Sequence, residues 1–122
     1  MITLRHATLA HNTGGAGFSL NSSTANVYNT IIWGNSETAY SPLAVAECNI
    51  DQGGTAGLAV NPQFLSPTVG VFRPVLGSPA IDACATGLTN DLLGTPRPIG
   101  SLFDMGAYEG LPPMIFLSIV LR

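Results

Sequence analysis

The chain has 122 residues, of which 46% are hydrophobic and 9% are charged, and its formal net charge is −3. Four scattered arginines cannot form the basic groove of a nucleic-acid-binding protein, so we expect no nucleic-acid partner. The apolar content excludes a disordered chain, and the 14 glycines and 9 prolines favour many short strands over long helices.

The first third of the chain contains an internal repeat. Residues 25–36 repeat residues 2–13 at an offset of 23 residues (25 − 2). A period near this length is typical of one rung of a β-solenoid, whereas two unrelated strand-turn units are the alternative. The offset aligns Leu4 with Val27, Leu9 with Ile32, Asn12 with Asn35, Thr13 with Ser36, and Leu20 with Leu43.

Side chains along each rung are expected to alternate between the inside and the outside. Alternation directs Leu4 and Ile32 inward and Arg5 and Trp33 outward. A third, imperfect rung is predicted at residues 43–50, followed by a loop at 51–57. We therefore expect an all-β fold with two to three parallel rungs in residues 1–60.

Two asparagines follow the predicted strands. Asn12 and Asn35 fall where the chain must bend, and asparagine tolerates the left-handed backbone conformation better than other residues that carry a Cβ. We expect both to adopt that conformation. Their side chains are also predicted to bond to each other along the stack, which gives both residues a structural role.

Residues 61–110 lack a clean period and are rich in turn-forming prolines, so an irregular segment that covers the last rung is predicted. Arg97, held between two prolines, is expected to bind a carboxylate through both ends of its guanidinium, with Asp104 or Asp82 as partner. Asp82 accepting backbone N–H bonds within its own turn is an alternative, as is a Ca²⁺ site among the acids of residues 77–110. A final short strand is predicted at 104–109.

Two cysteines are 36 residues apart (84 − 48) and have no metal-binding spacing. A disulfide between Cys48 and Cys84 requires the fold to bring them together, and the preferred interpretation is two buried free thiols. His6 and His11 are expected on opposite sides of the chain as surface residues. We expect neither a metal site nor a cofactor.

The search for catalytic residues favours a protein that is not an enzyme. Glu37 and Glu47 are the one pair of acids on neighbouring rungs that could act in a hydrolase, but solvated loop acids are the preferred interpretation. A polysaccharide lyase needs outward cations with acids beside them, and the regular rungs offer only Arg5. As an alternative, Tyr28 and Trp33 on one outward face could stack on carbohydrate, although a loop at 37–44 could cover Trp33.

Six short motifs occur in an order that resembles the end of a bacterial right-handed parallel β-helix of the pectate-lyase type. Residues 25–110 are most similar to the choice-of-anchor Q domain, and residues 2–36 also resemble the repeats of polymorphic outer-membrane proteins. Cys84 departs from the pattern, since glycine usually follows this motif. The motifs are NTIIWGN (29–35), CNID (48–51), NPQF (61–64), GSPAIDA (77–83), DLLGTPRPIG (91–100) and DMGAYE (104–109).

The resemblance implies the non-catalytic capping end of an exported or cell-surface β-helix protein, secreted or displayed for contact with a cell surface or polysaccharide. Residues 1–60 would supply the rungs and 61–110 the cap. The apolar tail, residues 111–122, is too short to span a membrane and is interpreted as a remnant of a sorting or anchoring element, or as an edge strand.

Proteins with this pattern usually have further rungs and a secretory signal before it, and the given sequence shows neither. We therefore expect a truncated gene, a fragment or a start at an internal methionine. Because the first rung has no cap, we expect the chain to associate with itself through it.

Overall fold

The computed structural model describes residues 1–17, 19, 23–37 and 43–110. In these ranges the regular secondary structure consists of short strands and a single 3-10 turn, which confirms the all-β expectation. Leu20 and the apolar tail at 111–122 lie outside the described residues, so the predictions made for them stay predictions.

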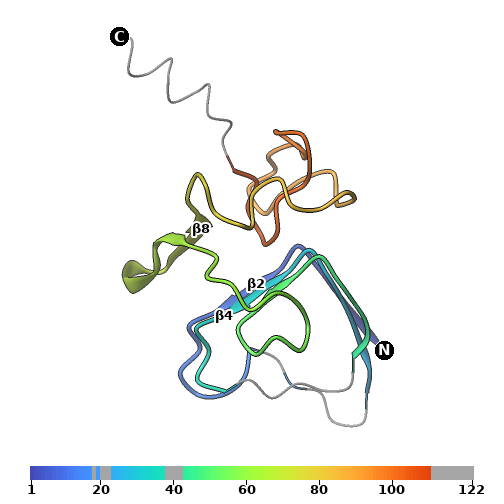
Figure 1. Ribbon diagram of the computed structural model, residues 1–122, viewed down its shortest axis with the longest axis vertical. Coiled ribbons are helices and arrows are strands. Elements are labelled where there is room, and N and C mark those ends of the chain that lie inside the picture. Colours follow the sequence, from blue (N-terminus) through green and yellow to red (C-terminus); the bar gives the residue numbers. More distant parts are fainter. Residues whose placement is uncertain (18, 20–22, 38–42, 111–122) are drawn as a thin grey trace.

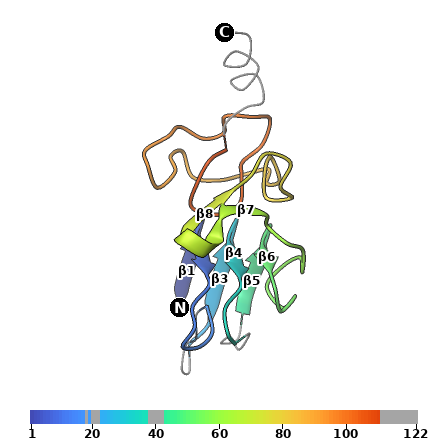
Figure 2. The same cartoon turned by 90° about the vertical axis from the view of Figure 1, so that its left-hand side faces the viewer.

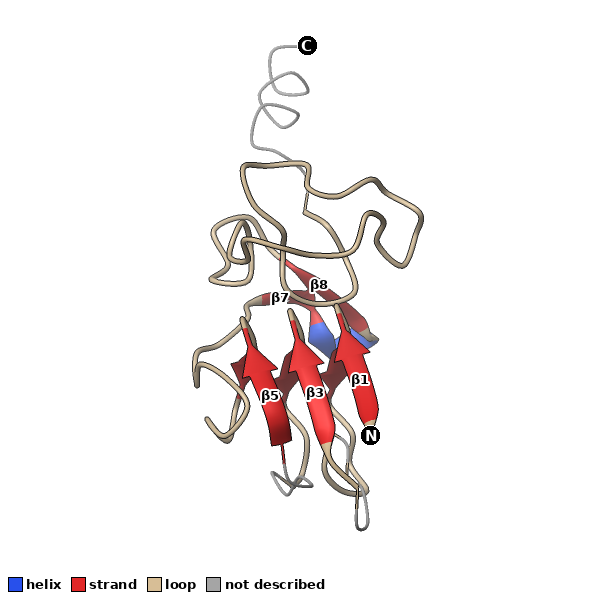
Figure 3. Ribbon diagram, turned by 90° about the vertical axis from the view of Figure 1, so that its right-hand side faces the viewer, coloured by secondary structure: helices blue, strands red, loops and turns tan. Residues whose placement is uncertain are grey.

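Three units of two strands each form the first half of the molecule. Their first strands form one parallel sheet in the order β1-β3-β5, and their second strands form another in the order β2-β4-β6. Figure 3 shows β1, β3 and β5 side by side, and in Figure 1 the units overlap in projection. Unit 1 contains β1 (Ile2–Arg5) and β2 (Thr8–Ala10), unit 2 contains β3 (Ala25–Tyr28) and β4 (Ile31–Trp33), and unit 3 contains β5 (Leu43–Glu47) and β6 (Ile50–Asp51).

The register of units 1 and 2 is the one that the repeat predicts. Leu4 pairs with Val27 and Leu9 with Ile32, as expected from the offset of 23 residues. The spacing in sequence between units 2 and 3 is shorter than that between units 1 and 2. The backbone N–H of Thr30 donates to Asn49 Oδ1, which is only 19 residues further on. The register shifts between Ala25 and Asn26, so that Ala25 pairs with Leu43.

Burial depends on how many neighbours a unit has. In unit 2, which lies between the other two, Val27 and Ile32 are at most 1% exposed. In unit 1, Ile2 is 44% exposed and Leu4 is only partly buried, since β1 is paired on one side alone. The inward positions of unit 1 therefore remain partly open to solvent.

The chain turns between the two strands of each unit at a residue with positive φ. These residues are His6, Asn29 and Cys48, with φ of 49°, 52° and 54°. At the next bend the left-handed residues are His11 and Gly34, one position before the predicted asparagines. The predicted conformation of Asn12 and Asn35 is therefore wrong, but their predicted bond is confirmed, because Asn12 Nδ2 donates to Asn35 Oδ1 at 2.8 Å.

The outer side of β6 is covered by the loop that follows it. Ile50 forms a parallel bridge with Leu58, whose N–H donates to the carbonyl of Asn49 at 2.9 Å. An antiparallel hairpin then joins β7 (Phe64–Ser66) and β8 (Val71–Pro74) through the 3-10 turn Pro67–Val69. Figure 2 shows this hairpin beside the stacked units.

The C-terminal segment, residues 77–110, contains no strand, only isolated bridges such as Cys84 with Phe103. The strand predicted at 104–109 is wrong: the chain bends at Gly106, whose φ is +88°. In Figure 3 the segment lies beyond the carboxyl ends of β1, β3 and β5. It thus runs along the corners of all three units instead of covering the last one, which corrects the expected placement.

Candidate functional site

The C-terminal segment makes a direct contact with the corner residue of every unit. The three corner residues occupy the same place after β1, β3 and β5, so they lie in a row along one side of the stack. The contacts are Arg97 Nη1 with His6 Nδ1 at 2.6 Å, Asn29 Nδ2 with the carbonyl of Thr86 at 2.6 Å, and Cys84 with Cys48 through a disulfide. We call this row of contacts the corner site.

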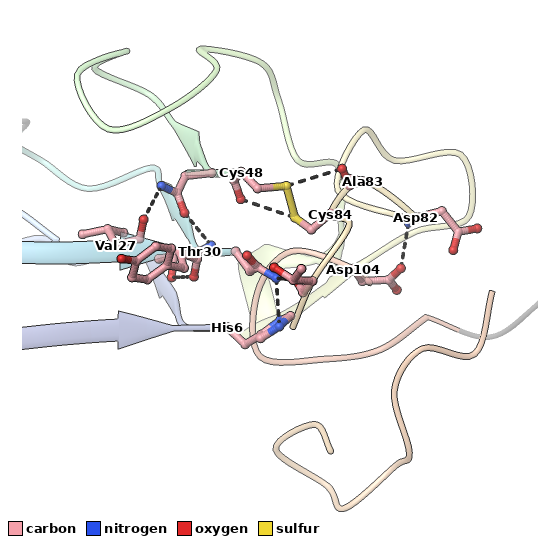
Figure 4. The surroundings of a disulfide bond; sticks show 12 residues. His6, Val27, Thr30, Cys48, Asp82, Ala83, Cys84 and Asp104 are labelled. Atoms are coloured by element: carbon pink, nitrogen blue, oxygen red, sulfur yellow. Dashed lines mark hydrogen bonds between the residues drawn. A yellow bond between two sulfur atoms is a disulfide. The ribbon is translucent and has the colours of Figure 1, made fainter. Parts of the chain in front are cut away.

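The disulfide joins unit 3 to the C-terminal segment. Cys48 and Cys84 are 36 residues apart in sequence, but their Cα atoms are 5.8 Å apart. Figure 4 shows the bond between the corner of unit 3 and the loop that contains Ala83. The preferred interpretation of two free thiols is therefore wrong, because the segment returns along the corners and passes Cys48.

Arg97 is the central cation of the corner site. Its Nη1 lies 3.2 Å from Glu109 Oε2, and both side chains are at most 1% exposed. It also donates to the carbonyls of Asp104 and Gly106 at 3.2 and 2.9 Å. Arg97 therefore pairs with the carboxylate of Glu109, and the predicted partners Asp104 and Asp82 are wrong. The predicted two-ended contact is also wrong, because only Nη1 reaches the carboxylate, while Nη2 donates to the carbonyl of Gly106.

The two acids first considered as partners bind backbone N–H groups instead. Asp104 accepts from the N–H groups of Asp82, at 2.8 Å, and Gly110. Asp82 Oδ1 accepts from Leu102 N at 3.1 Å, which lies outside its own turn. Burial raises the pKa of the Asp104 carboxyl, while these bonds oppose that shift. Both carboxyls therefore tie parts of the segment to one another.

A third acid, Asp91, fixes the stretch that leads to Arg97. Its Oδ1 accepts from Leu93 N and Thr95 N at 2.8 Å each, and its Oδ2 accepts from Glu109 N at 3.0 Å. Burial alone would raise the pKa of Asp91, but donation from these three N–H groups outweighs burial and lowers it. The ionised Asp91 carboxylate thus links the backbone of Leu93 and Thr95 to the backbone N–H of Glu109.

His6 is buried at the centre of the site, with 7% of its surface exposed, so its interpretation as a surface residue is wrong. Burial, and then the charge of Arg97, lower its pKa to about 4. Arg97 donates a hydrogen bond to the lone pair of His6 Nδ1, so the imidazole ring is neutral. His11 behaves differently: it is exposed at its corner and its ring centroid lies 5.2 Å from that of Phe72.

We predict that acidification destabilises the protein through His6. A His whose pKa is about 4 when folded and near 6.5 when unfolded favours the folded state fully above pH 6.5 and loses that contribution as the pH falls towards 4. Between pH 7 and pH 5 the free energy of unfolding is expected to fall by about 2 kcal/mol. Asp104 and Glu109, whose pKa values are raised by burial, act in the opposite direction at lower pH.

Urea unfolding at the two pH values measures this effect, with His6→Gln as the variant that cannot titrate and His11→Gln as the matched control. The His11 variant should keep the full pH dependence and the His6 variant should lose it. An equal fall in all three proteins would show that other groups are responsible.

The remaining candidate residues are not brought together at the corner site. Tyr28 is partly buried on β3, with the Arg5 guanidinium 4.2 Å from its ring centroid, and Trp33 packs against the core cluster that contains Ile31 and Ile50. Glu37 and Glu47 are exposed on separate elements. Carbohydrate stacking by Tyr28 and Trp33 stays a prediction.

The ionisable side chains of the corner site each accept a hydrogen bond from a named donor. His6 and Glu109 accept from Arg97, Asp91 accepts from Glu109 N, and Asp104 accepts from Asp82 N. Across the described ranges, no group of three His, Cys, Asp or Glu side chains is placed to hold a metal ion. The same ranges contain no helix of the length and hydrophobicity needed to cross a membrane.

Comparisons with known proteins return no match to a protein-family model, to a curated protein or to a solved structure. The corner site therefore has to be interpreted from its own geometry.

Sequence reasoning gave no role to four residues of the corner site, namely His6, Asn29, Asp91 and Glu109. His6 had a signal, since the offset of 23 residues aligns it with Asn29 at a unit corner. Glu109 had none, because its place depends on the bend at Gly106.

Proposed function

We propose that residues 1–110 form the terminal part of a right-handed parallel β-helix from an exported or cell-surface protein, with a structural rather than catalytic role. The observation that carries this proposal is the in-register parallel pairing of successive units, β1 with β3 and β2 with β4, together with the Asn12–Asn35 bond. Stacked parallel strands of like sequence are the basis of solenoid architectures. The motif resemblance to the choice-of-anchor Q domain supports the same proposal.

The disulfide supports export. Cys48 and Cys84 are bonded, and disulfides persist in secreted and cell-surface proteins but are rare where glutathione keeps thiols reduced. An exported protein also meets changes of pH and proteases. A covalent bond between the last unit and the C-terminal segment would protect the stack in that setting.

The structural role rests on how the polar groups of the C-terminal segment are used. Arg97, Glu109 and Asp104 bind one another and backbone groups, and their role is to fix the segment along the unit corners. In this proposal the segment ends the regular stack and leads to residues 111–122, which would present the chain for anchoring.

Duplication of one unit tests the β-helix. A chain in which residues 2–24 are repeated before residue 2 should add a unit over β1 and β2 and cover Ile2 and Leu4. Because solenoids gain stability from each neighbouring repeat, the melting temperature should rise by about 4 °C or more.

The control carries the same 23 inserted residues in shuffled order and should melt as the original chain does. An equal melting temperature for both insertions would contradict the proposed stack. A separate assay tests the structural role: formation of unsaturated product from uronate-containing polymers would show a lyase and would overturn it.

A further inference from the structure

The sheet β1-β3-β5 ends in two open edges. β3 is paired on both sides, whereas β1 and β5 are each paired on one side only within the described residues. Figure 3 shows the two edge strands at opposite ends of this sheet. Unpaired edges present a row of backbone N–H and C=O groups that can bind another strand. The second sheet differs at one end, because Leu58 already covers the outer side of β6.

We propose that the β5 edge of one copy of this chain binds the β1 edge of a second copy as a parallel strand. The strands are parallel, so the open edge of β5 corresponds to the edge through which β3 binds β5. In the same way, the open edge of β1 corresponds to the edge through which β3 binds β1. A β1 strand placed on β5 would therefore continue the series. This head-to-tail contact leaves one open edge on each side, so it extends into a series of copies.

Charge complementarity selects this pairing. Arg5 pairs with Tyr28, and Tyr28 pairs with Glu47, so these residues form one column across the sheet. In the same register, Arg5 of the second copy would lie beside Glu47 of the first, and both side chains are exposed. Pairing through two β1 edges puts no carboxylate near Arg5, since β1 contains none.

The apolar positions fit as well. Leu4, Val27 and Ala46 form the neighbouring column across the sheet. Leu4, which is partly buried, lies at one end of this column, and the small Ala46 lies at the other. In the head-to-tail pairing, Leu4 of the second copy would cover Ala46 of the first. Ile2, which is 44% exposed, would cover Leu43. The contact is thus a small apolar strip with an ion pair at one end.

Because Leu58 occupies the outer side of β6, the contact is confined to the β1–β5 sheet. We expect weak association that is sensitive to salt, because exposed ion pairs are screened at high ionic strength. Sedimentation velocity of the intact chain over a concentration series should show an average mass that rises with concentration and falls with added salt.

Charge reversal distinguishes head-to-tail pairing from its rivals. Arg5→Glu alone and Glu47→Arg alone should each weaken association by about tenfold or more, because each variant sets like charges against each other. A mixture of the two single variants should associate as the original chain does, and so should the double variant. Glu37→Arg, an exposed glutamate away from both edges, is the matched control and should change nothing.

Circular dichroism of each variant checks that the strands are kept. A chain that stays monomeric at every concentration would overturn the proposal, and so would single variants whose mixture does not recover. Association that persists unchanged in both single variants would show that the contact does not set Arg5 beside Glu47, and it would overturn the proposal as well. The inference does not rest on the proposed function, since unit duplication could succeed while these tests fail.

Discussion

Replacement of both cysteines in Cys48→Ser/Cys84→Ser should lower the free energy of unfolding by about 4 kcal/mol. The bond joins residues 36 apart, and closing a loop of that length removes much of the conformational entropy of the unfolded chain. It also holds the C-terminal segment to the corner of unit 3, where Cys84 is buried within the core cluster with Ile31 and Ile50. Urea unfolding measures the loss.

Reduction of the original chain is the control for this prediction, because it breaks the bond without changing a side chain. The reduced chain and the serine variant should unfold at similar urea concentrations, and both should unfold well below the oxidised chain. Peptide mapping under non-reducing conditions identifies the linked residues. If oxidised and reduced chains unfolded together, the disulfide could not be what holds the segment to unit 3.

Removal of the buried carboxylate in Glu109→Ala should cost about 3–5 kcal/mol, because it leaves the Arg97 guanidinium without its ion-pair partner in a site that excludes water. Glu109 Oε1 also accepts from Ile99 N at 3.1 Å, and Oε2 accepts from Asp104 N at 3.3 Å. Loss of the carboxylate therefore leaves several donors unsatisfied at once. Thermal and urea unfolding measure the cost.

Two further variants make this prediction specific. Glu47→Ala removes an exposed glutamate and should change the free energy of unfolding by less than about 0.5 kcal/mol. Arg97→Met/Glu109→Leu removes both charges and should recover part of the loss, because apolar side chains of similar volume can replace a buried pair. A cost below about 1 kcal/mol for Glu109→Ala would show that the pair does not hold the segment.

The two effects share one structural cause. Each unit of the stack is fixed at its corner by a different kind of contact with the C-terminal segment. His6 accepts a hydrogen bond from a charged donor, the side-chain amide of Asn29 donates a hydrogen bond to a carbonyl, and Cys48 forms a disulfide. The segment therefore holds the units side by side in addition to the strand pairing. Loss of any one contact should loosen the unit at which it lies.

The register of units 1 and 2 could be predicted because it equals the spacing of a repeat in the sequence. Inward side chains such as Leu4 and Val27 must stack on like neighbours, so the spacing that aligns them also aligns the strands. The Asn12–Asn35 bond follows from the same spacing. Unit 3 was predicted as a strand region, but its spacing of 19 residues has no such signal.

The corner site could be predicted only in part, because its contacts depend on the path of an irregular segment. Arg97 was identified as a carboxylate binder from its fixed backbone, yet the choice between Glu109, Asp104 and Asp82 is made by the bend at Gly106. The same holds for Cys84, whose partner is decided by where the segment returns. Sequence spacing carries no information about such a return.

The central claim is that units 1 and 2 lie on one another as parallel strands in the register that the repeat predicts. Nuclear Overhauser effects between methyl groups of the folded chain test it most directly. The account predicts cross-peaks between Leu4 and Val27 and between Leu9 and Ile32, residues that pair across 23 positions of sequence. Absence of these cross-peaks, with contacts instead between β1 and β2 as an antiparallel hairpin, would contradict it.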